Sequence, residues 1–130
     1  MDVKHGGIYL YEPPQTSSSP QAASLTQSGS EQAGLRPYII VSRDGANKGK
    51  PTAVGVPLTK QVHKANSYRI MLPAGELIPD LGCHPFVDSV ALCDHVRVLN
   101  LDQIRKKIGR LSENAVLGVE VGLANLFDIR

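Results

Sequence analysis

The chain has 130 residues, of which 42% are hydrophobic and 20% are charged, and its formal net charge is +2. These values fit one globular domain over residues 1–130, and a charge this small does not by itself indicate a nucleic-acid partner. Since no apolar run approaches the roughly 18 residues of a membrane span and the first residues lack a secretory apolar stretch, we expect a cytoplasmic protein that does not bind a membrane.

Short runs of β-branched and aromatic residues predict a mainly β chain. The run at residues 8–11 follows two glycines, and the run at residues 37–42 has the composition of a fully buried strand. Pro57 suits a strand end or an edge, where no ladder donor is needed. A turn cluster is expected at residues 44–49 and loops at 60–66 and 73–85. The expected strands cover residues 8–11, 37–42, 52–58, 67–72, 86–93, 96–99 and 107–111.

Residues 13–29 differ in composition from the rest of the chain. They contain three prolines, many Ser, Thr, Gln and Ala residues, and Leu25 as the one large apolar residue. Such a segment buries too little surface to offset its ordering entropy. We predict a flexible loop there, between two strands.

The C-terminal segment predicts a helix that begins at Ser112-Glu113. The Ser hydroxyl can accept from early backbone N–H groups, and the Glu favours the positive end of the helix. Gly118 and Gly122 each lower the helix propensity relative to alanine, and they would permit a close helix approach. Together with the strands, the helix suggests a small antiparallel barrel. The apolar residues at helical spacing are Ala115, Val116, Val119, Leu123, Leu126 and Phe127.

The familiar signatures of metal and phosphate enzymes are absent from the sequence. Cys83-His84 and Cys93-Asp94-His95 do not match the usual spacing of zinc ligands, so we expect no metal and no other cofactor. Two cysteines are too few for a disulfide framework, and both are expected as thiols. Basic residues cluster at Arg105–Arg110 and around residues 36–64, which fits either solvated loops or a nucleic-acid surface.

The strongest local feature is the run Gly29-Ser30-Glu31-Gln32-Ala33-Gly34-Leu35-Arg36-Pro37. Pro37 lacks a backbone donor and restricts Arg36 to extended conformations. The arginine would therefore be held at the entrance of a buried strand. On physical grounds alone, a turn with an exposed arginine is the favoured explanation of the run.

This run resembles the active-site loop of the MazF/PemK family of toxins. Four further stretches keep the order of that family, and together the matches cover about 100 of the 130 residues. They are Ile8-Tyr9-Leu10, Val54 to Thr59, Val90 to Arg97, and Ile108 to Ser112.

The resemblance implies an SH3-like antiparallel β-barrel of the MazF/PemK/CcdB type with a C-terminal helix. It also implies a homodimer, an antitoxin protein as partner, and cleavage of single-stranded RNA without a metal. Arg36, Thr59 and Asp94 match catalytic positions of the family, with Asp94 as the candidate base. The expected RNA-binding residues are Ser30, Glu31, Gln32, Arg43 and Lys60.

Several positions depart from the pattern of the family. Leu92 stands where one branch has an arginine proposed as the acid, and Ser30 stands where that branch has a histidine. A mechanism that uses Arg36 with Thr59 therefore fits this chain better than that branch's mechanism. An Asp at a strand end can equally bond to the backbone, so the base remains open at this stage.

Two other functions fit the same barrel. One is a non-catalytic toxin that inhibits DNA gyrase through its C-terminal helix, and the other is an inactive barrel that binds RNA or protein. The joint presence of Arg36, Thr59 and Asp94 favours the endoribonuclease, because gyrase inhibition does not need these residues.

Overall fold

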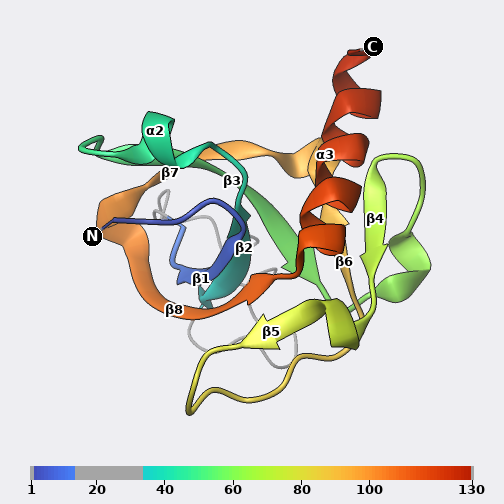
Figure 1. The fold of residues 1–130 in the computed structure, drawn as a ribbon, viewed down its shortest axis with the longest axis horizontal. Helices are drawn as coiled ribbons and strands as arrows, with labels where there is room; N and C mark the ends of the chain where they lie inside the picture. The colour runs from blue at the N-terminus through green and yellow to red at the C-terminus, as the bar shows by residue number, and fades with distance from the viewer. Residues whose placement is uncertain (1, 14–33, 130) are drawn as a thin grey trace, which may run out of the picture.

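The computed structural model describes residues 2–13 and 34–129 (Figure 1). The predicted flexible loop at residues 13–29 lies outside the described residues from residue 14 onward, as do Ser30, Glu31 and Gln32. No helix in the described ranges is long and apolar enough to cross a membrane.

In the described residues, eight strands form one curled antiparallel sheet, a half-barrel, which confirms the predicted mainly β fold with a C-terminal helix. Their order across the sheet is β4-β6-β3-β2-β1-β8-β5, and β7 also pairs with β3. Bulges between β1 and β8 help the long β8 to bend around the molecule (Figure 1). The strands are β1 (Gly7–Tyr11), β2 (Arg36–Ile40), β3 (Thr52–Thr59), β4 (Arg69–Leu72), β5 (Leu77–Pro79), β6 (Ser89–Leu92), β7 (Arg97–Asn100) and β8 (Ile104–Leu111).

Strand β3 changes partners along one of its edges. It pairs with β7 over Thr52–Gly55 and with β6 at Leu58 and Thr59, while β2 occupies its other edge. The 3-10 helix η4 (Cys93–His95) joins β6 to β7 beside the gap. Pro57 lies in this gap, where a residue without an N–H leaves no ladder bond unmade. Pro57 was expected at an edge or a strand end, and it lies inside β3 at a stretch of one edge that neither β6 nor β7 pairs.

The sheet buries a separate apolar cluster on each face. One cluster packs under α3 (Glu113–Phe127), which stands beside β4 and β6 (Figure 1). The other contains Tyr9, Tyr11 and Tyr38 and faces away from that helix. Because successive residues of a strand point to opposite faces, β1, β2 and β3 contribute to both clusters.

Helix α3 begins as predicted, at an N-cap formed by Ser112. The Ser112 hydroxyl accepts from the backbone N–H of Ala115 at 3.1 Å and donates to the Glu76 carboxylate, while the Ser112 N–H donates to the Glu76 carbonyl at 2.9 Å. These bonds tie the first turn of the helix to the segment before β5.

Local structure departs from the sequence prediction in three places. Residues 44–47 form the one-turn helix α2 (Asp44–Asn47) rather than an open turn, because Asn47 is buried and bonds to Ser42. The expected loop at 73–85 contains β5, which pairs with the end of β8. The strand expected at 86–93 is confined to Ser89–Leu92, since Cys93 enters η4. Other 3-10 helices among the described residues are η2 (Val62–Lys64), η3 (Ala74–Glu76) and η5 (Leu101–Gln103).

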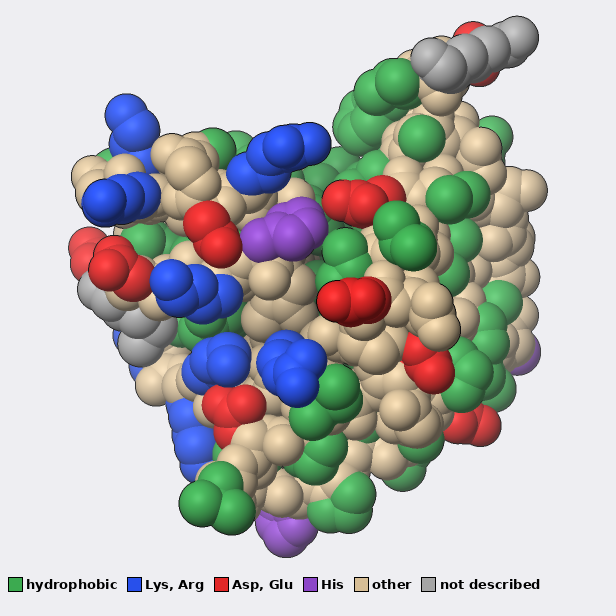
Figure 2. Space-filling model, in the orientation of Figure 1, with side chains coloured by type: hydrophobic (Ala, Val, Ile, Leu, Met, Phe, Trp, Pro, Cys, Tyr) green, Lys and Arg blue, Asp and Glu red, His purple; other side chains and the backbone are tan. Residues whose placement is uncertain are grey.

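Charged and apolar side chains separate on the face that shows α3. Lys and Arg gather over the half that carries α2 and β8, and hydrophobic side chains cover much of α3 (Figure 2). Leu117, Val121 and Phe127 of this helix are exposed. This arrangement leaves α3 with an apolar outer surface.

The two glycines of α3 predict opposite responses to alanine. A Cβ on Gly122 would lie 2.7 Å from Cγ1 of Ile70 and 2.9 Å from Sγ of Cys93, whereas a Cβ on Gly118 would make an ordinary 3.5 Å contact with Ile70. Gly122→Ala should lower the free energy of unfolding by about 1–3 kcal/mol through overpacking. Gly118→Ala should raise it by up to about 1 kcal/mol through helix propensity.

Urea unfolding at one fixed protein concentration measures both variants. An unchanged or raised stability of Gly122→Ala would show that the helix does not need this close approach. The same measurement on Gly118→Ala controls for the general effect of replacing a helical glycine.

Candidate active site

Two of the predicted catalytic residues lie at the ends of adjacent strands. Tyr38 on β2 pairs with Pro57 on β3, and extending this register by two residues brings Arg36 across from Thr59. Residues opposite each other in an antiparallel pair point to the same face of the sheet. Arg36, at the start of β2, and Thr59, at the end of β3, therefore lie at the same end and on the same face of this strand pair.

Two aromatic residues lie next to Arg36 in the sheet, Tyr11 on β1 and Tyr38 on β2. Arg36 pairs with Tyr11 on β1, and the Tyr11 and Tyr38 rings pack edge to face with centroids 5.2 Å apart. The guanidinium of Arg97, on β7, lies 5.9 Å from the centroid of Tyr11. Tyr11 also accepts a hydrogen bond from the backbone N–H of Asn100 at 3.2 Å. A second arginine thus lies beside Tyr11.

The Thr59 side chain keeps its hydroxyl proton available to a ligand. Its oxygen accepts from the backbone N–H of Gln61 at 3.3 Å, which orients the hydroxyl. Within the described residues, no acceptor takes the Thr59 proton. Thr59 can therefore donate to an anionic oxygen placed beside Arg36.

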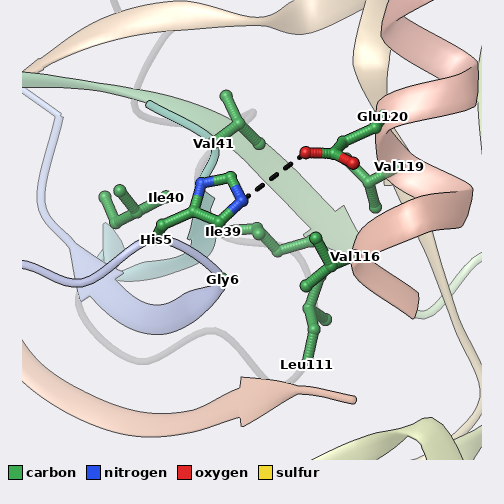
Figure 3. Close-up of a pocket in the computed structure, with 9 residues that line it drawn as sticks. All are labelled: His5, Gly6, Ile39, Ile40, Val41, Leu111, Val116, Val119 and Glu120. Carbon is green, nitrogen blue, oxygen red and sulfur yellow. Dashed lines mark ion pairs between the residues drawn. The ribbon is translucent and has the colours of Figure 1, made fainter. Parts of the chain in front are cut away.

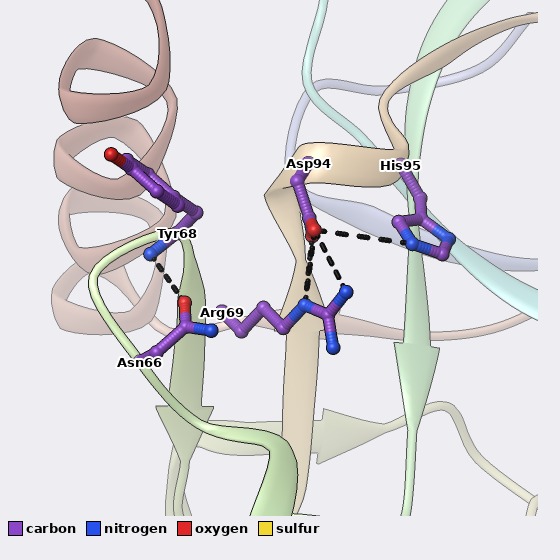
Figure 4. Close-up of polar contacts among 5 residues, drawn as sticks. All are labelled: Asn66, Tyr68, Arg69, Asp94 and His95. Carbon is purple, nitrogen blue, oxygen red and sulfur yellow. Dashed lines mark hydrogen bonds and ion pairs between the residues drawn. The ribbon is translucent and has the colours of Figure 1, made fainter.

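Asp94 lies on η4 and forms a two-pronged ion pair with Arg69 of β4 (Figure 4). Nε of Arg69 donates to both carboxylate oxygens at 3.1 Å, and Nη2 donates to Oδ2 at 2.8 Å. Nε2 of His95 is 3.9 Å from the same Oδ2. The Asp94 carboxylate is thus held by a neighbouring strand.

The ion pair shifts both of its members toward their charged forms. The hydrogen bond from Arg69 is the main cause that lowers the pKa of Asp94, against a smaller opposing effect of burial. The same bond raises the pKa of Arg69. At neutral pH the carboxylate is therefore ionised and weakly basic.

The predicted RNA-binding residues divide into separate places. Lys60 directly follows Thr59, at the same end of β3. Arg43 precedes α2 and lies beyond the other end of β2 from Arg36, so the structure does not bring these two together. Ser30, Glu31 and Gln32 fall outside the described residues.

Both cysteines are free thiols with different surroundings. Cys93 is buried, and burial is the main cause that raises its pKa to about 11, so its thiol stays protonated. Cys83 is partly buried. Across residues 2–13 and 34–129, no cluster of three or more His, Cys, Asp or Glu side chains could hold a metal ion.

A small apolar pocket lies between the N-terminal segment, β2 and α3 (Figure 3). Its volume of about 10 Å³ has room for barely one water molecule. His5 closes it through a 3.7 Å contact between Nε2 and the Glu120 carboxylate. The pocket is too small for a substrate and does not include Arg36, Thr59 or Asp94.

Sequence reasoning missed two arginines of this site, Arg69 and Arg97. Arg69 begins a strand that was predicted correctly, and nothing in its local pattern set it apart from other exposed basic residues. Arg97 was part of a family stretch without a role of its own. The contacts of Arg69 with Asp94 and of Arg97 with Tyr11 join residues far apart in the sequence, so they are visible only in the structure.

Comparison with known proteins identifies the family. The family model of PemK-like, MazF-like toxins of type II toxin–antitoxin systems matches residues 21–127. An endoribonuclease MazF of Staphylococcus epidermidis is 32% identical over 95 residues, which cover 73% of this chain and 75% of the relative. An endoribonuclease MazF of Staphylococcus saprophyticus is 30% identical over 101 residues, covering 73% and 80%.

The fold comparison agrees with the sequence comparison. A MazE–MazF structure from Deinococcus radiodurans has a TM-score of 0.69 at 18% identity and covers 100% of this chain and 99% of that one. The chain therefore belongs to the family of PemK-like and MazF-like toxins. The two staphylococcal relatives described above are endoribonucleases. The family resemblance, the fold class and the enzyme class expected from the sequence are confirmed.

The Arg69–Asp94 pair predicts a pH-dependent contribution to stability. Because the folded-state pKa of Asp94 is lowered, its contribution is present above the unfolded pKa and is lost as the pH falls through the folded pKa. Asp94→Asn should therefore be less stable than wild type at pH 7, and the difference should shrink below about pH 4.

Thermal unfolding between pH 7 and pH 3 measures this difference. Asp102→Asn is the matched control, because the Asp102 carboxylate makes no ion pair within the described part of the chain. An Asp94→Asn deficit of the same size at both ends of this pH range would contradict the assignment.

Proposed function

We propose that this protein is the toxin of a type II toxin–antitoxin system and cleaves single-stranded RNA without a metal. In this reaction the ribose 2′-OH attacks the adjacent phosphate and leaves 2′,3′-cyclic phosphate and 5′-hydroxyl ends, and loss of mRNA inhibits translation and growth. The observation that supports it most is the register that places Arg36 and Thr59 on one face of the sheet.

The chemistry needs donors where negative charge develops on the phosphorane. Arg36 supplies a permanent planar cation that matches phosphate geometry. Because a guanidinium does not release a proton readily, Arg36 suits charge stabilisation and donation toward the leaving oxygen rather than a role as base. Thr59 adds a hydroxyl donor for a non-bridging oxygen.

The base that accepts the 2′-OH proton was expected to be Asp94. We keep Asp94 as a residue of the proposed site, because η4 sets it beside the middle of β3. Both of its oxygens accept from Arg69, however, which limits its ability to take a proton.

The same proposal includes the partners of the toxin. The Deinococcus structure contains a MazE–MazF pair, and we propose a comparable antitoxin that covers Arg36 here. We also propose a homodimer in the cytoplasm. The apolar side chains of α3 that are exposed in the single chain would be buried in its interface. RNA would further contact Ser30, Glu31, Gln32, Arg43 and Lys60.

Incubation of the purified protein with a long unstructured RNA in excess EDTA tests this function. We expect fragments with 5′-hydroxyl and cyclic-phosphate ends. Intact RNA together with arrest of DNA gyrase in a parallel assay would instead indicate a gyrase inhibitor of the same fold. Intact RNA without gyrase arrest would indicate a binding protein that is not an enzyme.

Substitution of Arg36 tests the proposed phosphate site. Arg36→Ala should lower kcat by at least about 100-fold, the range for loss of one preorganised donor, because the charge on the phosphorane loses its main partner. Size-exclusion chromatography should show an unchanged oligomeric state. Arg105→Ala removes an arginine of β8 that is paired with Glu12 and should cleave RNA like wild type. Full RNase activity of Arg36→Ala would contradict the proposed role of Arg36 in stabilising the phosphorane.

A further inference from the structure

Arg69 shares a sheet face with the proposed catalytic pair. Met71 on β4 pairs with Val90 on β6, and Val90 pairs with Thr59 on β3. Side chains at paired positions point to one face, and so do residues two apart on one strand. Arg69, two residues before Met71, therefore points to the same face as Thr59 and Arg36.

The ion pair with Asp94 fixes the guanidinium of Arg69 but engages only some of its N–H donors. Its Nε and one N–H of Nη2 engage the Asp94 carboxylate, which leaves three of its five N–H donors. No acceptor within the described residues takes these remaining donors. The Arg69 side chain is 27% exposed, so the free side of the guanidinium can reach a ligand.

Because Arg69 donates to both of its oxygens, the Asp94 carboxylate is poorly placed to act as a base. A carboxylate whose two oxygens both accept from one guanidinium must lose part of that contact to bind a proton. What the pair offers is a fixed, planar cation on the sheet face that carries Thr59 and Arg36. Phosphate oxygens are the ligands that such a fork recognises in both charge and shape.

Strand order separates Arg69 from Arg36. Three strand spacings of about 4.8 Å lie between β4 and β2, which amounts to about 14 Å measured along the curled sheet. A single phosphate beside Arg36 and Thr59 would therefore leave Arg69 facing another part of the same strand of RNA.

We propose that Arg69 binds a phosphate that flanks the cleaved bond, and that Asp94 is a positioning residue for the Arg69 guanidinium rather than the general base. This inference rests on the proposed function, because it concerns how the same RNA is held. It makes Arg69 a determinant of RNA affinity, and it moves the search for the base away from Asp94.

Binding of a non-cleavable RNA separates affinity from chemistry. The probe is a single-stranded oligonucleotide with 2′-O-methyl groups, titrated at several salt concentrations. For single strands, the slope of log binding constant against log salt changes by about 0.7 for each phosphate contact that is lost. Arg69→Ala should bind more weakly with a slope shallower by about this amount, and Arg69→Lys should keep the wild-type slope because it keeps the charge.

Matched controls make the result specific. Arg105→Ala breaks an arginine–carboxylate pair on β8, which strand order places far from β4, and should leave both affinity and slope unchanged. Urea unfolding of Arg69→Ala shows whether the variant is folded. If it is not, the comparison of Arg69→Lys with a third variant, Arg69→Gln, carries the same test of charge.

The kinetics of cleavage test the role of Asp94. Asp94→Asn should keep kcat within about 100-fold of wild type and leave the acidic limb of the pH–rate profile in place, since loss of a general base costs about 100-fold or more. A larger fall in kcat, with loss of that limb, would restore Asp94 as the base and overturn this part of the inference.

An unchanged salt slope and affinity in Arg69→Ala would overturn the phosphate contact. The proposed function has its own, separate readout, which is cleavage by wild type in EDTA. Wild type that cleaves RNA while Arg69→Ala behaves normally would defeat only the inference, whereas wild type that neither binds nor cleaves RNA would defeat both.

Discussion

The exchange of partners along one edge of β3 determines where the functional side chains lie. Because β7 pairs with one half of β3 and β6 with the other, the connection between them must turn beside the middle of β3, and η4 forms there. That turn carries Asp94. The opposite edge of β3 pairs with β2 at Gly55, Val56 and Pro57, and the same register extended by two residues sets Arg36 opposite Thr59. A shift of β2 by one residue would send the Arg36 side chain into the apolar cluster under α3.

Charge and burial divide the two faces of the sheet. Helix α3 covers one face with a close contact at Gly122, so that face serves stability. The other face presents Arg36, Thr59 and Arg97 above buried tyrosines. A rigid aromatic layer of this kind keeps cationic side chains at defined positions, and a phosphate-binding site depends on that order. The Asp94 carboxylate holds the Arg69 guanidinium in a defined position through an ion pair.

Much of this arrangement could be predicted from the sequence, because its signals are local. The residue composition of the strands, the Ser112 cap and the helical spacing of apolar residues up to Phe127 each depend on residues that are close together in the sequence. Strand β5 escaped prediction because Pro79 follows only two apolar residues and its pairing with β8 is non-local. The contact between Arg69 and Asp94 joins residues 25 positions apart, and it is the pairing of β4 with β6, which sets Arg69 opposite Leu92, that brings them together.

The central claim is that Arg36 and Thr59 act on one phosphate, and a double-mutant cycle tests it most directly. The cycle compares kcat/KM of wild type, Arg36→Lys, Thr59→Val and the double variant. If both residues hold the same group, the account predicts a double variant that is distinctly less impaired than the product of the single effects, with a coupling of about 0.5–3 kcal/mol. Effects that multiply without coupling would show two independent residues and contradict a shared site.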